Sequence, residues 1–202
     1  GIMIKTGVKT LGFEGKYTTF NDYSAMSKAF EGIKLVPVDA ALDELRSVKT
    51  RDEISLIKKA ASINDRAFAK TLKKIKAGVT ERQVSSELEY QMRKLGADGL
   101  AFTTIVAFGA NTSKPHAHAG DTVLREGMPV TIDFGCKYKG YCSDITRTFA
   151  FGDPGADFRK IYDAVLNANM RGISAVKAGV KGCDVDNASR DYLKSEGLAE
   201  YL

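Results

Sequence analysis

Asp133 and Asp144 are the two side chains whose type and spacing best suit chemistry, since both lie in a stretch with strand character at 130–149. If the chain reverses at Tyr138 and Lys139, as the neighbouring Gly140 favours, the aspartates face each other on adjacent strands with Cβ atoms about 5 Å apart. Like charges at that distance are destabilising unless a shared proton, a cationic side chain or a metal compensates. Two hard oxygen ligands therefore suit one divalent ion, or two ions bridged by one carboxylate.

The same spacing leaves other arrangements open. One aspartate could face solvent or pair with Arg147, and the register could slip by one residue. If both aspartates share one face of the sheet, alternation predicts that Ile132, Phe134 and Ile145 point to the other face and pack on helices. Residue alternation would thus separate a polar site from the hydrophobic core.

The three cysteines, Cys136, Cys142 and Cys183, form no CxxC motif and leave one thiol unpaired in any disulfide scheme. Cys142 is expected on the aspartate face and Cys136 on the other, so we predict no disulfide across this hairpin. The unpaired thiols are typical of a reducing compartment, and the predicted location is the cytoplasm.

His116 and His118 are the only histidines of the chain. Their spacing could place both rings on one side of an extended segment, as in some zinc sites. From spacing alone, a polar surface loop is the favoured interpretation.

The elements that must position these residues follow from the hydrophobic pattern. Apolar residues recur with helical period over 51–76, and Thr80 with Gln83 forms the pattern of a capping box at the start of a second helix that ends at Gly96. A strand is predicted at 102–108, a loop at 109–120, two strands within 130–151, and a further helix around 161–176.

An internal repeat indicates two related helical pairs. The sequence KAGV at 76–79 recurs at 177–180, an offset of 101 residues that Val84 and Val185 share, as do Gly96 and Gly197. We predict a structural duplication, in which strands follow Gly96 but the matching strands would have to follow Leu202.

The N-terminal residues read as the tail of a separate domain. A short apolar stretch at 8–13, a helix at 21–30 capped by Asn21 and a strand at 34–38 are too little to bury a core of their own. The predicted organisation is a domain remnant and linker at 1–44, followed by an incomplete catalytic domain at 45–202.

The bulk properties exclude several classes of protein. Of 202 residues, 44% are hydrophobic and 27% charged, which favours a globular fold over disorder. The net charge is +5, but the lysines lie beside acidic residues along the predicted helices and form no basic patch. We therefore expect no nucleic-acid partner. No apolar run is long enough to span a bilayer, and residues 1–5 lack signal-peptide character, so no membrane partner is expected.

Four segments together resemble the creatinase, Xaa-Pro dipeptidase and aminopeptidase P family: TIVAFGAN at 104–111, PH at 115–116, IDFG at 132–135 and GYCSDITRTF at 140–149. LRSVKTRDEI at 45–54 is similar to the family's interdomain linker, which methionine aminopeptidases generally lack. The resemblance implies an α+β fold of the pita-bread (creatinase/aminopeptidase) type. The chain would hold its first half and the start of the second pseudo-symmetric half, preceded by the tail of a creatinase-type N-terminal domain.

The resemblance also implies roles for individual residues. Asp133 and Asp144 match the first two of five metal ligands, with Asp144 bridging two divalent ions that would be Mn²⁺, with Co²⁺ or Zn²⁺ as alternatives. His116 matches the histidine that contacts substrate near the scissile bond, Arg147 would support the site from behind, and His118 has no transferable role. The remaining histidine and two glutamate ligands are expected after Leu202, so the 202-residue chain alone should bind metal weakly and be inactive.

The function predicted on this basis is metal-dependent hydrolysis of the peptide bond before proline, by an Xaa-Pro dipeptidase or aminopeptidase. The partner would be a peptide with proline in second position, and family members commonly form homodimers. Two alternatives are a non-catalytic pita-bread module that binds peptides or proteins, and a creatinase-like amidinohydrolase. The presence of both Asp133 and Asp144 favours an enzyme over the binding module, because an opposed carboxylate pair costs stability without a metal.

Overall fold

The computed structural model describes residues 7–202 and separates into two compact units, Gly1–Ser55 and Leu56–Leu202. Each is described by itself. The first five residues, which the signal-peptide prediction concerned, lie outside the described residues, and the predicted domain boundary at 44/45 stays a prediction. Across residues 7–202, no helix is long and apolar enough to cross a membrane.

The first unit is a small β-α-β arrangement followed by a helix. Its elements are β1 (Thr10–Phe13), α2 (Phe20–Ala29), β2 (Lys34–Pro37) and α3 (Asp39–Ser47), and the two strands pair in parallel. Helix α2 is capped by Thr19, whose hydroxyl accepts from the backbone N–H of Asp22, and not by Asn21 as predicted. No residue at 7–55 is buried, which confirms that this unit is too small to form its own core.

Two long helices open the second part of the chain. Helix α4 (Arg51–Leu72) is shorter than the predicted 51–76, because residues 73–74 form a turn and Gly78 then donates to the carbonyl of Leu124. Helix α5 (Glu81–Lys94) begins with the predicted capping box between Thr80 and Gln83. Gly96, with φ of +103°, follows its end in a conformation that favours glycine.

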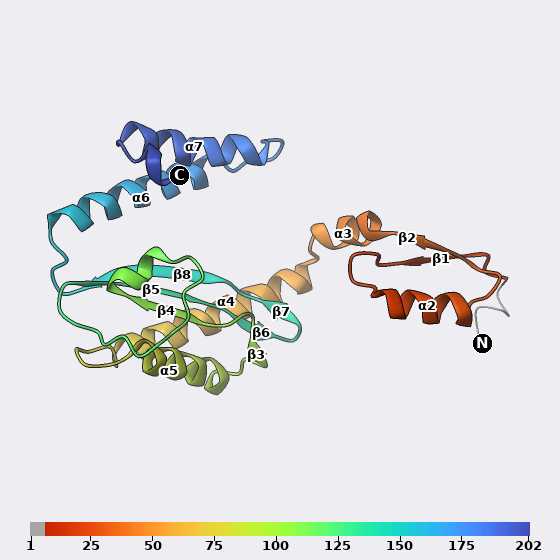
Figure 1. Ribbon diagram of the computed structural model, residues 1–202, viewed down its shortest axis with the longest axis horizontal. Helices are drawn as coiled ribbons and strands as arrows, with labels where there is room; N and C mark the ends of the chain where they lie inside the picture. The colour runs from red at the N-terminus through yellow and green to blue at the C-terminus, as the bar shows by residue number, and fades with distance from the viewer. Residues whose placement is uncertain (1–6) are drawn as a thin grey trace. The chain divides into compact units, whose positions relative to one another are not determined.

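Antiparallel strands lie over these helices (Figure 1). β4 (Ile105–Phe108), β5 (Met128–Phe134) and β8 (Ile145–Phe151) form one sheet in the order β4-β5-β8. β3 (Gly99–Leu100), β6 (Cys136–Tyr138) and β7 (Tyr141–Cys142) form another in the order β3-β6-β7. A 3-10 helix, η1 (Gly109–Ser113), follows β4.

The hairpin turns at Lys139 and Gly140, one residue later than predicted. Tyr138 pairs with Tyr141, and the two turn residues have φ of +47° and +84°, as a tight two-residue hairpin turn requires. Asp133 consequently pairs with Thr146 on β8, not with Asp144. The predicted register was wrong because the left-handed conformation at Lys139, a residue that rarely adopts it, carried no signal in the sequence.

The core forms between the helix pair and one face of the strands. Ile63 of α4 and Met92 of α5 are fully buried with Ile132 and Phe134 of β5, and Ile145 packs against the same cluster. The ring of Phe134 stacks on Phe68 at 5.5 Å between centroids. The predicted packing of Ile132, Phe134 and Ile145 on helices is confirmed.

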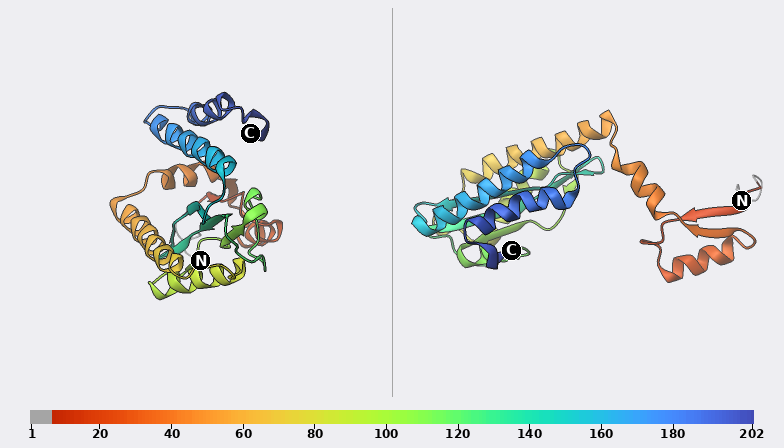
Figure 2. Two further views of the ribbon diagram at one scale, coloured as in Figure 1. Left: turned by 90° about the vertical axis from the view of Figure 1, so that its left-hand side faces the viewer. Right: turned by 90° about the horizontal axis from the view of Figure 1, so that it is seen from above.

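A second helix pair follows the strands: α6 (Ala156–Ala175) and α7 (Gly182–Ser195), ending in the short 3-10 helix η2 (Ala199–Tyr201). Both bounds of α7 lie 101 positions after those of α5, which confirms the predicted duplication at the level of the helix pairs. The two helices lie side by side (Figure 2), and the Ser189 hydroxyl donates to the carbonyl of Ala168. Gly172 allows this approach, since a Cβ there would lie 2.5 Å from that hydroxyl.

Candidate functional site

A cavity of about 350 Å³ brings together residues from four separate segments of the chain. Strand β5 and the β7–β8 connection each contribute one aspartate, and the loop after η1 contributes both histidines. The lining residues are Phe102, Thr103, Ile105, His116, Ala117, His118, Asp133 and Asp144. The residues singled out in the sequence as candidate ligands and substrate contact therefore meet in one place.

Asp133 occupies the centre of the sheet, between Ile105 of β4 and Thr146 of β8. The Thr146 hydroxyl donates to Oδ1 of Asp133 at 2.8 Å. This bond fixes the carboxylate in one orientation over the cavity. The sequence analysis did not identify Thr146, although a hydroxyl two residues after an aspartate on a paired strand is a signal that could have found it.

Asp144 lies in the break between β7 and β8, where Ser143 and Gly135 hold the two strands together. The buried Ser143 hydroxyl accepts from the Cys136 N–H at 3.2 Å, and the Ser143 N–H donates to the Cys136 carbonyl at 3.0 Å. At Gly135 a Cβ would lie 2.1 Å from the Ser143 carbonyl, so only glycine fits. Asp144 is thus a diagonal neighbour of Asp133 on the same face, since it lies two residues before the partner Thr146.

The histidines extend from a loop with one buried anchor. His116 and His118 are exposed and both line the cavity, while Ala117 between them is buried. The favoured interpretation from spacing, a polar surface loop, describes their exposure but not their position beside the two aspartates. His118, which the resemblance left without a role, lines the same cavity as His116.

Arg147 does not line the cavity. It pairs with Ile132 in the sheet register, so its side chain lies on the face of the sheet opposite to that of Asp133 and Thr146. Its guanidinium donates to the Thr146 carbonyl at 2.8 Å. A supporting role for Arg147 stays a prediction, and the contact available for it is with the backbone of the residue that binds Asp133.

The donor set fits part of a divalent metal site. Asp133 and Asp144 supply hard oxygen ligands on one cavity, as Mn²⁺ and similar ions prefer. Within residues 7–202 no group of three or more His, Cys, Asp or Glu side chains is close enough to hold a metal. Cys136 is not a candidate ligand, because burial raises the pKa of its thiol and its Sγ lies 3.4 Å from the Ala60 carbonyl. All three cysteines are free, so no disulfide crosses the hairpin.

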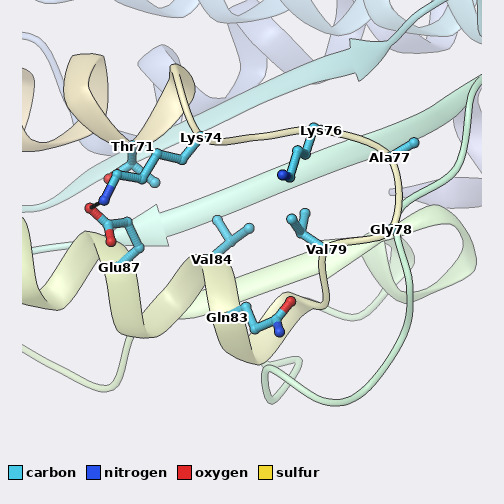
Figure 3. Close-up of a pocket in the computed structure, with 9 residues that line it drawn as sticks. All are labelled: Thr71, Lys74, Lys76, Ala77, Gly78, Val79, Gln83, Val84 and Glu87. Carbon is cyan, nitrogen blue, oxygen red and sulfur yellow. Dashed lines mark ion pairs between the residues drawn. The ribbon is translucent and has the colours of Figure 1, made fainter.

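A second, larger cavity of about 480 Å³ lies where α4 connects to α5 (Figure 3). Its polar wall is an ion pair between Lys74 and Glu87 at 2.8 Å, and Gly78 and Val79 line the connecting segment. The Lys74 ammonium lowers the pKa of the Glu87 carboxyl, with a further contribution from the Gln91 amide. Opposite charges here satisfy each other, so this groove lacks the uncompensated carboxylates of the aspartate cavity.

Comparison with known families places both parts of the chain. Residues 55–202 match the model of metallopeptidase family M24, and residues 2–48 match that of the creatinase/prolidase N-terminal domain. The uncharacterized peptidase YqhT of Bacillus subtilis is 41% identical over 196 residues, which cover 97% of this chain and 56% of the relative.

Two solved structures share the fold closely. An Xaa-Pro dipeptidase from Bacillus anthracis is 43% identical with a TM-score of 0.94, and an X-Pro aminopeptidase from Thermotoga maritima is 37% identical with the same TM-score. Each match covers 98% of this chain and 56% of the other, so the chain spans about half the length of these relatives. The predicted pita-bread fold is confirmed.

Proposed function

The chain belongs to metallopeptidase family M24, and from this premise we propose that the whole protein is an Xaa-Pro exopeptidase that hydrolyses the peptide bond before proline. The observation that carries the proposal is the meeting of Asp133, Asp144 and His116 on one cavity. Similarity to an Xaa-Pro dipeptidase and to an X-Pro aminopeptidase supports the substrate class.

Asp133 and Asp144 would hold one side of the metal centre, with Mn²⁺ as the metal. When bound, the divalent ions supply an activated water and polarise the scissile carbonyl. Thr146 keeps one oxygen of Asp133 in a hydrogen bond, which orients the carboxylate and leaves its other oxygen for a cation. Ser143 fixes the backbone next to Asp144, so the backbone positions of both aspartates are set by the strands.

His116 would contact the substrate near the scissile bond. Its position on an exposed loop over the cavity lets the ring approach a bound peptide, and a ring N–H can donate to the oxygen on which negative charge develops. Arg147, behind Thr146, would keep the Asp133 partner in place. The three free cysteines support a reducing compartment, so a cytoplasmic location is part of the proposal, as is a homodimer.

The test is an assay of the whole protein after removal of metal and reloading with Mn²⁺, Co²⁺ or Zn²⁺. Ala-Pro, Ala-Ala and Pro-Ala dipeptides compare the position of proline, and the tripeptide Ala-Pro-Ala separates a dipeptidase from an aminopeptidase. We expect metal-dependent cleavage of Ala-Pro or Ala-Pro-Ala, and no cleavage of Ala-Ala or Pro-Ala. Absence of Xaa-Pro cleavage with every metal would contradict the proposal. Peptide binding without cleavage would instead support the non-catalytic module, and hydrolysis of creatine the amidinohydrolase.

A further inference from the structure

Glu81 is a fully buried carboxylate that the site chemistry described above does not use. It is the first residue of α5. Within the described residues it forms no ion pair with a lysine, arginine or histidine. A buried charge requires strong compensation, so its partners indicate what it does.

All three hydrogen-bond partners of the Glu81 carboxylate belong to the segment that carries the histidines. Oε1 accepts from the Phe108 N–H at 2.8 Å and from the Asn111 side-chain amide at 2.9 Å. Oε2 accepts from the Gly120 N–H at 3.0 Å. One carboxylate thus binds the last residue of β4 and the far end of the loop, and His116 and His118 lie between these two attachment points.

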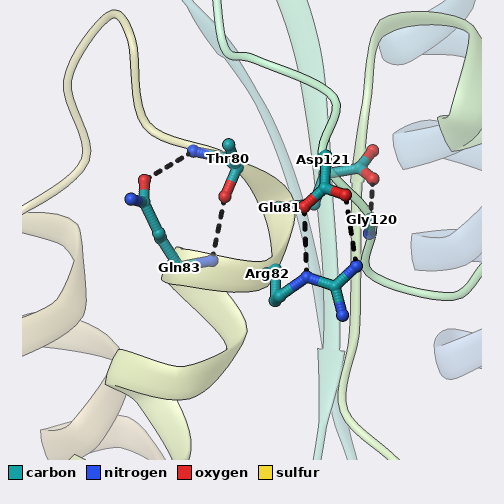
Figure 4. Close-up of polar contacts among 6 residues, drawn as sticks. All are labelled: Thr80, Glu81, Arg82, Gln83, Gly120 and Asp121. Atoms are coloured by element: carbon teal, nitrogen blue, oxygen red, sulfur yellow. Dashed lines mark hydrogen bonds and ion pairs between the residues drawn. The ribbon is translucent and has the colours of Figure 1, made fainter.

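Arg82 and Asn111 strengthen the same attachment, and Figure 4 shows the Arg82–Asp121 pair beside the hydrogen bond between Glu81 and Gly120. The Arg82 N–H donates to the Gly120 carbonyl at 2.9 Å, and the Arg82 guanidinium pairs with Asp121 at 3.1 Å. The Asn111 amide also donates to the Thr122 hydroxyl at 3.0 Å. The N-terminus of α5 therefore holds both ends of residues 109–119, hereafter the histidine loop.

We propose that Glu81 is a positioning residue for peptide cleavage, which acts by holding the histidine loop so that His116 stays on the aspartate cavity. The inference rests on the proposed function, because it assigns Glu81 an effect only through the substrate contact of His116. An ordered loop lowers the entropy lost when His116 meets the substrate, and a small displacement of such a group costs rate.

Glu81→Gln is the most specific test, since it keeps the shape of the side chain but leaves one acceptor oxygen and one NH₂ group. In either orientation of the amide, NH₂ faces the N–H of Phe108 or of Gly120, so one end of the loop is released. In the whole protein loaded with Mn²⁺, we expect kcat for an Xaa-Pro substrate to fall on the order of 10- to 100-fold. Mn²⁺ binding should be unchanged, because neither aspartate lies on the loop. Hydrogen exchange should become faster in peptides from 109–119 but not in β5.

Glu87→Gln is the matched control on the same helix. It removes the ion pair with Lys74 in the groove of Figure 3 and touches no residue of the histidine loop. We expect its kcat to stay within about twofold of the parent, as for a surface ion pair.

A double-mutant cycle separates positioning from general stability. If Glu81 acts through His116, Glu81→Gln should change kcat less than about threefold in a His116→Ala background. Should Glu81→Gln fail to fold, Asn111→Ala removes one donor to the same carboxylate and should show a smaller loss with the same non-additivity. Multiplicative losses, or full activity of a folded Glu81→Gln, would overturn this inference alone. A parent protein that does not cleave Xaa-Pro bonds would overturn the proposed function and this inference with it.

Discussion

The helix pairs α4–α5 and α6–α7 are similar in length, with α5 and α7 related by the same offset of 101 residues, but their surroundings differ. Helix α5 buries Val84, Leu88 and Met92 against the strands, whereas α7 has no buried residue. On α6, large apolar side chains remain exposed, among them Val165 at 51% and Ile173 at 58%. The first helix pair thus packs against the strands, whereas the second pair has apolar side chains exposed to solvent.

The difference shows which properties the local sequence determines. Helix length, the KAGV turn and the glycine after each second helix recur in both pairs, so they do not depend on the strands. The burial of the helices and the placement of candidate site residues do depend on the strands. In the described part of the chain, the first pair packs against the strands that carry Asp133, and Glu81 of α5 reaches the histidine loop.

The largest contrast in stability is expected at the equivalent valines Val84 and Val185. Val84 is 4% exposed, whereas Val185 is partly exposed. Val84→Ala should lower the free energy of unfolding of the 202-residue chain by about 2 kcal/mol, because it removes buried methyl groups and leaves a cavity. Val185→Ala should cost less than about 1 kcal/mol. If urea unfolding showed equal losses of free energy for Val84→Ala and Val185→Ala, the two helix pairs would be equally buried, which would contradict the difference described above.

A smaller contrast is expected at the helix N-termini. Thr80 caps α5, whereas Lys181, the equivalent position before α7, forms no side-chain cap. Thr80→Ala should lower the free energy of unfolding by about 1 kcal/mol, and Lys181→Thr should raise it by up to about 1 kcal/mol. The midpoints of thermal unfolding measure both changes. A Lys181→Thr chain with a lower midpoint than the parent would contradict the expected effect of the cap.

The smallest effect is expected from the Lys74–Glu87 ion pair that joins α5 to the α4 connection. The native pKa of Glu87 is lowered by Lys74, so its stabilisation is present above the ordinary glutamate pKa of about 4.3 and lost as pH falls through the lower native value. Since Lys74 is largely exposed, the contribution is about 0.5 kcal/mol or less. Glu87→Gln should remove this part of the acid dependence in unfolding curves from pH 7 to pH 3. If the pH dependence of the free energy of unfolding were unchanged in Glu87→Gln, the ion pair would not contribute to stability.

Local signals predicted much of the fold. The capping box at Thr80, the positive-φ glycines and the helical period of α4 are properties of short segments, and each appears in the structure. Strand alternation correctly separated Ile132 and Phe134 from Asp133. The turn at Lys139 and Gly140 was missed, because cross-strand register depends on which residue tolerates positive φ, and here a lysine adopts it.

The sequence singled out three residues that line the cavity, but not the residues that hold them in place. Asp133, Asp144 and His116 carry motif signals, whereas Ser143, Thr146 and Glu81 stand out only through their hydrogen-bond partners on other segments. Glu81 is separated from Gly120 by 39 positions, and helix N-termini commonly carry acidic residues for other reasons. The role proposed for Glu81 rests on the contacts of both carboxylate oxygens.

The central claim is that Asp133 and Asp144 form part of a metal site that cleaves Xaa-Pro bonds. Its most direct test compares the whole protein with Asp144→Asn, and with Asp191→Asn as a matched change at an exposed aspartate of α7 that pairs with Lys194. In an assay of Ala-Pro hydrolysis with saturating Mn²⁺, we predict that Asp144→Asn lowers kcat/KM at least about 1,000-fold, since several kcal/mol of transition-state stabilisation depend on the metal. Asp191→Asn should have parental activity. Full activity of Asp144→Asn would contradict the claim.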